Sequence, residues 1–310
     1  MFGRCASLCA CVAAACTVLC LQGQVKASPT NDYNLIVFGD YYSTSQVAGR
    51  AIIGGSLLQT SVYAAYLQPS AYQGRDTLTV GGNINGVAIV CAGNLRVGGQ
   101  INGQALTYNG RVIHDSGIDL SGLEAQLKAE SASYAGLAAN STYALPGSQP
   151  TNVTFNAQPS GTGSLAVFDL SADFFSNGLI QQIDLALNGT DTVLFNVSGT
   201  RINFDSSSCF TGSLTQSSVQ SKILWNFYEA EEIDLGSHLF YGSILAPYAE
   251  ITASNHILGT VAAESMYTYG AVNMPTFAGN LPEPATVPVP GAFALVLTGG
   301  LFLRRRRRPA

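Results

Sequence analysis

The sequence predicts a mainly β protein, a parallel β-solenoid with one long helix packed along its side. The first observation is composition: of 310 residues 47% are hydrophobic, only 11% are charged, and 33 are glycine. This excludes a disordered polyelectrolyte and favours short buried strands joined by tight corners. The second observation is a short pattern that recurs at a spacing of 17 residues in two distant segments, as expected of stacked coils.

The repeat also predicts which side chains are neighbours. Two pairs of segments carry it: residues 80–86 with 97–103, and residues 242–246 with 259–263. Equivalent positions of successive coils lie on adjacent strands, about 4.8 Å apart. We therefore expect Ile84 to stack on Ile101, and Ile244 on Val261, inside the core.

Glycine pairs mark the expected corners of the coils. They occur at residues 54–55, 81–82 and 98–99. None opens a helix with the spacing of a phosphate-binding loop, so nucleotide binding is not indicated. Glycine is typical of a corner where a Cβ atom would clash with the neighbouring coil.

One segment breaks the β pattern. Residues 121–140 are predicted to be helical, with Ser121 and Glu124 as a capping box and an end before Pro146. The apolar residues of this segment fall close to a single helical face: Leu123, Leu127, Tyr134 and Leu137. Because the segment lies between the two repeat-bearing regions, we expect it to pack along the side of the solenoid.

More strands are predicted after the helix. Apolar and polar residues alternate within residues 165–170 and 192–197, and turns are expected at residues 177–178 and 188–189. No linker long enough to separate two domains precedes about Gly279. We therefore expect a single solenoid domain over residues 28–281.

The N-terminus predicts export. Residues 1–27 contain a basic residue, an apolar stretch and small residues at the end, as in a secretory signal peptide. Signal peptidase is expected to cut between Ala27 and Ser28. A lipoprotein signal is the weaker alternative, because no cysteine follows a clear lipoprotein box. Only Cys91 and Cys209 lie beyond this segment, which leaves room for a single disulfide.

The C-terminus, residues 282–310, predicts sorting at a membrane. Pro282, Glu283 and Pro284 precede an uncharged stretch of nearly membrane-spanning length. An arginine block follows that would hold the end of the precursor on the cytoplasmic side. The block comprises Arg304, Arg305, Arg306, Arg307 and Arg308.

This tail resembles the PEP-CTERM sorting signal of Gram-negative bacteria. The resemblance implies an exosortase-type processing enzyme as a partner and removal of the tail. It also implies delivery to the cell envelope, the cell surface or the extracellular matrix, with the precursor transiently in the inner membrane. An ordinary C-terminal anchor is the alternative that the same hydrophobic segment allows.

The body resembles the bacterial choice-of-anchor A domain, an adhesive module, over roughly residues 32–278. The motifs that carry the resemblance occur in the order of the family: residues 35–40, 47–55, 196–199, 225–227 and 242–249. The family often has a Gly-Glu pair and a histidine near its closing strand. This chain has residues 269–273, Tyr-Gly-Ala-Val-Asn, at that place, so the resemblance assigns no role to such a histidine.

Charge and motif content argue against other functions. Residues 28–281 hold 7 Lys/Arg against 18 Asp/Glu, so no basic surface for nucleic acid is expected. The three histidines lack metal-ligand spacing, and no cofactor motif is present. Asp234, Ser237 and His238 form a weak candidate triad without a nucleophile elbow. The acidic run at residues 229–234 fits a solvated strand edge better than a calcium loop.

The sequence therefore predicts no catalytic, cofactor or metal site, and an exported adhesive or matrix-associated protein that is not an enzyme. Exopolysaccharide is a candidate ligand, and several tyrosines could stack on sugars. The alternatives are a carbohydrate-active enzyme and an ice-binding-like surface protein. The enzyme requires two carboxylates about 5 to 9.5 Å apart in a cleft. Ice binding calls for a flat ladder of Thr-x-Thr motifs, and the chain offers only isolated cases such as residues 77–79.

Overall fold

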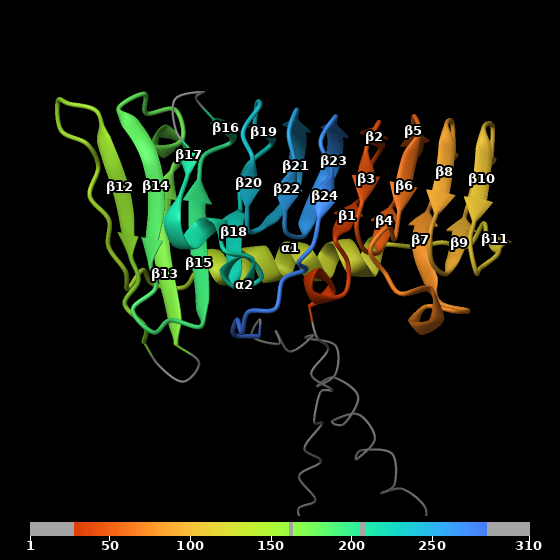
Figure 1. Ribbon diagram of the computed structural model, residues 1–310, viewed down its shortest axis with the longest axis horizontal. Helices are drawn as coiled ribbons and strands as arrows, with labels where there is room; N and C mark the ends of the chain where they lie inside the picture. The colour runs from red at the N-terminus through yellow and green to blue at the C-terminus, as the bar shows by residue number, and fades with distance from the viewer. Residues whose placement is uncertain (1–27, 161–163, 205–208, 284–310) are drawn as a thin grey trace, which may run out of the picture.

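Parallel strands stack along one axis in the computed structural model, which describes residues 28–160, 164–204 and 209–283 (Figure 1). Every pairing between named strands is parallel, as a solenoid requires, and the predicted fold class is confirmed. The signal segment before Ser28 and the tail from Pro284 onward lie outside the described residues.

The coils present three faces. The helix face runs through β11 (Val112–His114), β9 (Asn94–Val97), β7 (Asp76–Val80), β4 (Ala51–Ile53), β1 (Leu35–Val37), β23 (Val261–Thr268), β21 (Ser243–Ala253), β18 (Ile223–Phe227), β15 (Thr192–Ser198) and β13 (Leu165–Ser171). The ladder face runs through β5 (Leu57–Leu58), β2 (Tyr41–Ser43), the later halves of β23 and β21, β19 (Glu232–Asp234) and β16 (Arg201–Asn203). The third face runs through β10 (Gln104–Thr107), β8 (Val87–Val90), β6 (Ser61–Tyr63), β3 (Gln46–Val47), β24 (Val272–Asn273), β22 (Ile257–Leu258) and β20 (Phe240–Tyr241).

Smaller elements complete the fold. The end of the solenoid that contains β13 is called the wide end, and the end that contains β11 the narrow end. A three-stranded sheet lies at the wide end: β12 (Thr151–Asn156), β14 (Ile180–Ala186) and β17 (Cys209–Phe210). Short helical turns fill the loops: η1 (Pro29–Asn31), η2 (Pro69–Ala71), η3 (Ala172–Phe174), η4 (Gly212–Thr215) and α2 (Ser217–Gln220). No helix within the described ranges is long and apolar enough to span a membrane.

The coils do not follow one another in chain order. β1 pairs with β23, with Leu35 opposite Val261, so the first strand lies in the middle of the solenoid beside one of the last. From this seam the N-terminal half builds outward to β11. The chain then crosses to the opposite end, starts again at β12 and β13, and returns to the seam (Figure 1). β2–β23 and β3–β24 close the seam on the other two faces.

The predicted stacking is confirmed. Ile84 bridges to Ile101, and Ile244 is the register partner of Val261. The side chains of Ile84, Ile244 and Val261 are fully buried, whereas Ile101, near the end of the stack, is partly buried. The 17-residue spacing is therefore one turn of the solenoid in both regions.

The glycine pairs form the corners, as predicted. A Cβ atom on Gly81 would lie 2.3 Å from the carbonyl oxygen of Gly54, and one on Gly98 would lie 2.3 Å from that of Gly81. The amide of Gly81 donates to the carbonyl of Ile53 at 2.7 Å, which holds the coils at this separation. The corners therefore stack too closely for any side chain.

The two halves are filled differently. Rings stack in register across β13, β15 and β18: Phe168 lies 5.0 Å from Phe195, which lies 3.9 Å from Trp225. Successive coils here are long, since Val193 pairs with Ile223, and large rings fill the wider interior. The sequence predicted that buried and exposed side chains alternate over residues 192–197. This prediction is wrong, because all six side chains are buried. One face of β15 meets the core and the other meets the long helix.

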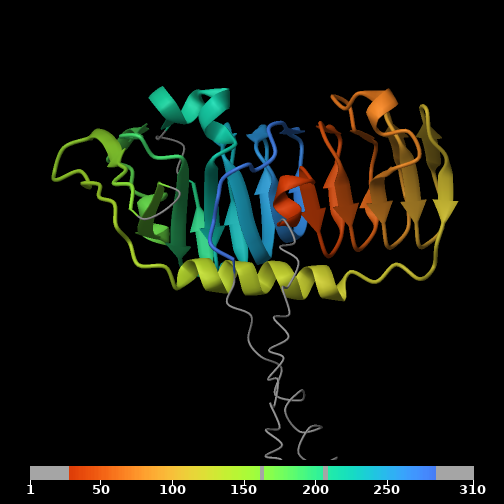
Figure 2. The ribbon, with the colours of Figure 1, turned by 90° about the horizontal axis from the view of Figure 1, so that it is seen from below.

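The long helix α1 (Ser121–Ala135) lies along the helix face, as predicted (Figure 2). Leu127 and Tyr134 are buried against outward residues of the strands, with Leu123 and Leu137 partly buried beside them. Two expectations were wrong. The helix ends at Ala135, where the amide of Gly136 bonds back into the last turn, and Ser121 is a helical residue rather than the cap. Asp119 instead accepts the Ser121 amide at 2.9 Å.

Two buried asparagines attach α1 to the sheet. Asn226 donates to the backbone oxygen of Ser131 at 2.9 Å and accepts the Ser131 hydroxyl at 2.7 Å. It also donates to Asn196, which donates to the backbone oxygen of Tyr134 at 2.8 Å. Both asparagines lie at register partners of β15 and β18, within the family-like motifs of the sequence. These two motif residues therefore hold the helix against the sheet.

Both ends of the described body meet one turn of α1. The Ser28 hydroxyl donates to the buried carboxylate of Glu130 at 2.7 Å. At the other end Leu281 packs in the cluster that contains Tyr134. Burial, with the charges of Glu130 and Glu283, raises the pKa of Tyr134. The segments that precede Ser28 and follow Glu283 therefore join the body at the same place.

Replacing Gly81 with Ala should lower the free energy of unfolding by about 1 to 3 kcal/mol, because the added methyl group overlaps the stacked corner. Gly122 in α1 has open space, so Gly122→Ala is the matched control and should be neutral or stabilising by up to about 1 kcal/mol. Urea unfolding of both variants measures the difference. Equal stabilities would contradict the close stacking of the corners.

Replacing Asn226 with Ala should also destabilise the fold, by about 1 to 3 kcal/mol for each buried partner left without a hydrogen bond. Asn152→Ala is the control, since the Asn152 side chain bonds Gln182 at the exposed surface. Thermal unfolding followed by circular dichroism compares the two. A neutral Asn226→Ala variant would show that packing alone holds α1.

Candidate functional site

The ladder face is built from eight tripeptides, one per coil, in which the middle side chain points into the core and the outer two point to solvent. In spatial order they are Gln100-Ile101-Asn102, Asn83-Ile84-Asn85, Ser56-Leu57-Leu58, Asp40-Tyr41-Tyr42, Ser265-Met266-Tyr267, Glu250-Ile251-Thr252, Glu232-Ile233-Asp234 and Arg201-Ile202-Asn203. The outer residues are all partly or fully exposed. Two parallel rows of side chains therefore run across eight successive coils of the solenoid.

The narrow end of the ladder face is held by its own side chains. Asp40 accepts the amide of Ser56 at 2.6 Å, Ser56 accepts that of Asn83 at 3.2 Å, and Asn83 accepts that of Gln100 at 2.7 Å. In the second row Asn102 donates to Asn85 at 2.9 Å. Because each coil fixes the next, this part of the face is a rigid array of amide groups.

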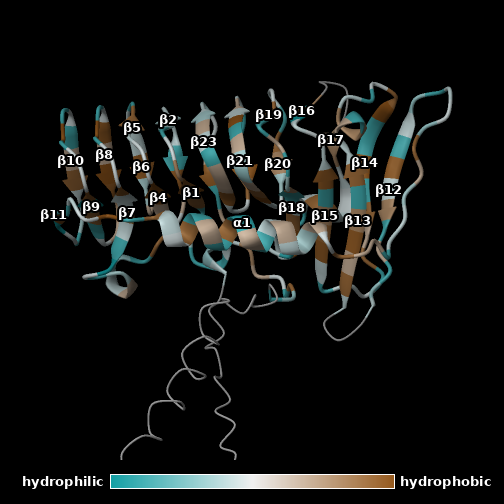
Figure 3. Ribbon diagram, turned by 180° about the vertical axis from the view of Figure 1, so that it is seen from behind, coloured by the Kyte–Doolittle hydropathy of each residue, from teal (hydrophilic) through white to brown (hydrophobic). Residues whose placement is uncertain are grey.

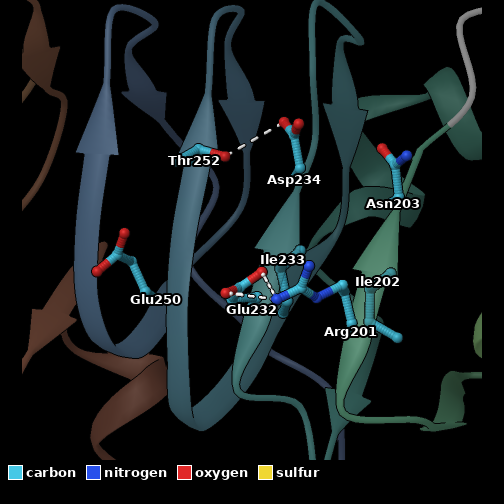
Figure 4. Close-up of a pocket in the computed structure, with 8 residues that line it drawn as sticks. All are labelled: Arg201, Ile202, Asn203, Glu232, Ile233, Asp234, Glu250 and Thr252. Carbon is cyan, nitrogen blue, oxygen red and sulfur yellow. Dashed lines mark hydrogen bonds and ion pairs between the residues drawn. The ribbon is translucent and has the colours of Figure 1, made fainter.

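The wide end of the ladder face is charged and hollowed (Figure 4). The hollow has a volume of about 410 Å³ and lies over β16, β19 and β21. Arg201 Nη2 lies 2.9 and 2.8 Å from the two carboxylate oxygens of Glu232. Asp234 accepts from the Thr252 hydroxyl at 3.2 Å. The Glu250 carboxylate, on the register partner of Glu232, belongs to neither interaction.

Three tyrosines occupy the middle of the ladder face, at the seam. The rings of Tyr42 and Tyr267 stack at 4.0 Å with an interplanar angle of 9°. The ring of Tyr269 stands nearly perpendicular to both, and its hydroxyl lies 2.6 Å from that of Tyr267. The hydrogen bonds with Tyr269, and then with Tyr42, raise the pKa of Tyr267. Tyr267 and Tyr269 are exposed and Tyr42 is partly exposed, so the three rings form one aromatic cluster at the surface.

The weaker sequence candidates do not assemble into sites. Asp234 accepts the amide of Gly236, and His238 Nδ1 lies 3.2 Å from the backbone oxygen of Leu235, so the triad is not formed. The acidic run is not at a strand edge, because β19 pairs with β16 on one side and β21 on the other. Cys91 and Cys209 carry free thiols, which answers the open question of a disulfide. Across the described ranges no group of three potential ligands could hold a metal ion.

Only some of the predicted processing residues are among the residues that the structure describes. Ser28, Pro282 and Glu283 lie at the ends of the described body, while Ala27, Pro284 and the arginine block of residues 304–308 lie outside it. Cleavage at either end therefore stays a prediction.

Comparison with known proteins identifies the family. A family model described as "Putative Ice-binding-like adhesive domain" matches residues 26–274. The chain belongs to this family. The match covers the same body as the adhesive-domain resemblance of the sequence, which it confirms. No curated protein matches the chain.

Solved ice-binding proteins are similar to this ice-binding-like adhesive domain at low identity. One from an Arctic yeast is 12% identical, over 83% of this chain and 95% of that one, with a TM-score of 0.35. One from an Antarctic biological consortium is 13% identical, over 83% and 94%, with a TM-score of 0.34. A domain from Shewanella frigidimarina is 13% identical, over 81% and 96%, with a TM-score of 0.32.

Part of the ladder face could be predicted from the sequence, but its full extent could not. The repeat 80–86 and 97–103 contains two of the tripeptides, but their central isoleucines were the only positions given a role. The missed signal is a glycine corner followed by three residues: an outward polar residue, an inward apolar residue and a second outward residue. Gly55-Ser56 and Gly39-Asp40 begin two such triplets. At the wide end no glycine precedes the triplets, so only the register reveals them.

Proposed function

We propose that this protein is an exported, surface-sorted adhesive or matrix-associated protein, that it is not an enzyme, and that the ladder face is its recognition surface. One observation carries the proposal: two rows of exposed amide, acidic and aromatic side chains run across eight successive coils of a rigid solenoid on one face. Such an array suits binding to an extended repetitive polymer, of which exopolysaccharide is the candidate from the sequence. Membership of the adhesive-domain family supports the same assignment.

The position of the two chain ends supports this role. Ser28 and Leu281 both lie at the region of α1, which runs along the middle of the helix face (Figure 2). In Figure 1 the ladder-face strands β2, β5, β16 and β19 lie along the upper edge, away from α1 and the ends of the described chain. A body attached through its C-terminal segment would therefore present the ladder face away from the point of attachment.

A carbohydrate-active enzyme is a weaker assignment for the same surface. Glu232 and Glu250 are register partners that line the same hollow, which is the arrangement such an enzyme would use. Both oxygens of Glu232, however, contact Arg201, so this carboxylate is already engaged in an ion pair. The exposed, charge-paired hollow therefore favours binding over hydrolysis.

Ice binding is the second candidate, favoured by the regular spacing of the ladder and by the family description. The residue types on the ladder face argue against ice binding. Of its sixteen outward residues only Thr252 is a threonine, and five are charged. Charged and bulky side chains interrupt a flat array of hydroxyl groups. We therefore place adhesion first.

The adhesion proposal predicts that blocking the ladder face abolishes attachment of the producing cells to their own exopolysaccharide matrix. The double variant Asn85→Lys with Asn203→Lys places bulky charges at both ends of the face and should reduce attachment at least about tenfold. The control is Gln104→Lys with Asn152→Lys, two exposed positions on β10 and β12. Unchanged attachment by the ladder variant, displayed at normal level, would overturn the proposal.

The same two variants decide between adhesion and ice binding. The purified full chain is tested for thermal hysteresis and for inhibition of ice recrystallisation. Adhesion predicts no activity in either assay. Strong activity that the ladder variant loses and the control keeps would replace adhesion with ice binding.

The sorting proposal predicts that the surface form lacks the arginine block of residues 304–308. An exosortase-type enzyme is expected to cut near residues 282–284, where the prolines cannot donate backbone hydrogen bonds and the chain is open to a protease. Mass spectrometry of the extracellular fraction measures the C-terminus. Intact peptides that end in Pro309-Ala310 would contradict processing, and normal delivery after neutralising all five arginines would contradict a sorting role.

A further inference from the structure

The seam assembles a second feature on the ladder face, a small hollow of about 150 Å³ beside the stacked tyrosines. Its walls come from β2, β5, β21 and β23, which belong to both ends of the chain. The lining residues are Asp40, Tyr42, Leu58, Glu250, Ser265, Met266 and Tyr267. The hollow is comparable in size to a single sugar ring and opens on an aromatic surface.

The charges around the hollow are of one sign. Asp40 and Glu250 are both exposed and line it, and neither forms an ion pair with any described residue. Asp40 uses one oxygen to accept the Ser56 amide, and Glu250 has only a long contact of 3.5 Å with the Ser265 hydroxyl. Both carboxylates therefore keep acceptor capacity for a ligand.

The wider ladder face reinforces this field. Its outward residues include four carboxylates and a single cation, Arg201, which is already paired with Glu232. An acidic polymer would be repelled from such a surface, whereas a cation would be attracted to it. A tyrosine ring next to the carboxylates adds an aromatic face that attracts cations and packs against the C–H face of a sugar.

We propose that the tyrosine hollow binds a positively charged amino sugar within a polysaccharide, with the sugar ring against Tyr267 and its ammonium group between Asp40 and Glu250. This inference rests on the proposed recognition role of the ladder face and names the class of ligand for its centre. The ammonium group has three N–H donors and matches two carboxylates that lack a cation. N-acetylation would remove the charge and leave both carboxylates without a partner.

The experiment is calorimetric titration of the purified full chain with three probes of equal length. They are an oligomer of glucosamine, its N-acetylated form and an oligomer of glucuronate. We expect the glucosamine oligomer to bind at least about tenfold more tightly than the N-acetylated one, with weakening at raised salt, and no binding of the glucuronate oligomer. Equal affinity for the first two oligomers, or preference for glucuronate, overturns the proposal.

Substitutions locate the site. Tyr267→Ala should weaken glucosamine binding about tenfold, while Tyr267→Phe keeps the ring and most of the affinity. Glu250→Gln should remove most of the preference for the charged oligomer. Tyr108→Ala and Asp173→Asn are the matched controls, because both residues are exposed and lie outside the ladder tripeptides. Thermal unfolding confirms that each variant is folded, and unchanged binding by folded Tyr267→Ala and Glu250→Gln overturns the assignment.

Failure here is distinguishable from failure of the adhesive role. If no amino-sugar preference is found but the Asn85→Lys, Asn203→Lys variant still loses attachment, the ligand assignment falls and the recognition role of the ladder face stands. If attachment is unaffected as well, both fall.

Discussion

The pairing of β1 with β23 is the contact on which the rest of the molecule depends. It joins the first strand of the body to one of the last, with Leu35 opposite Val261 and Val37 opposite Ala263. Asn34 reinforces this pairing in two ways. Its side-chain amide donates to the backbone oxygens of Gly259 and Asn273, and its backbone carbonyl accepts the amide of Val261. The core is continuous across this seam, so neither half can bury its central coil without the other.

The seam dictates the course of the remaining chain. Because the N-terminal half grows outward from the middle, the chain must cross the full length of the solenoid before the second half begins (Figure 3). α1 makes the middle part of this crossing (Figure 2) and covers apolar outward residues such as Ile36 and Leu245, which the strands alone would expose. The buried pair Asn196 and Asn226 fixes the helix through its backbone, at a position where α1 also receives Ser28.

The same seam places functional groups side by side that are far apart in the chain. Tyr42 and Tyr267 are separated by most of the body, yet their rings are in stacking contact. Asp40 and Glu250 line one hollow for the same reason. A face built in this way exists only in the completed fold.

The class of fold could be predicted from the sequence, because corner glycines and a 17-residue spacing are local features of the shorter stacked coils. The sequence also determined that residues 121–140 contain a helix on the side of the solenoid, and it held the motifs that carry the family. The order of the coils could not be predicted, since a repeat period does not state which coil lies next to which. The extent of the ladder face also depends on the folded chain, because the outward residues of β16, β19 and β21 follow no common spacing and are related only by register. Long-range pairing, which no local pattern encodes, is the physical reason for this division.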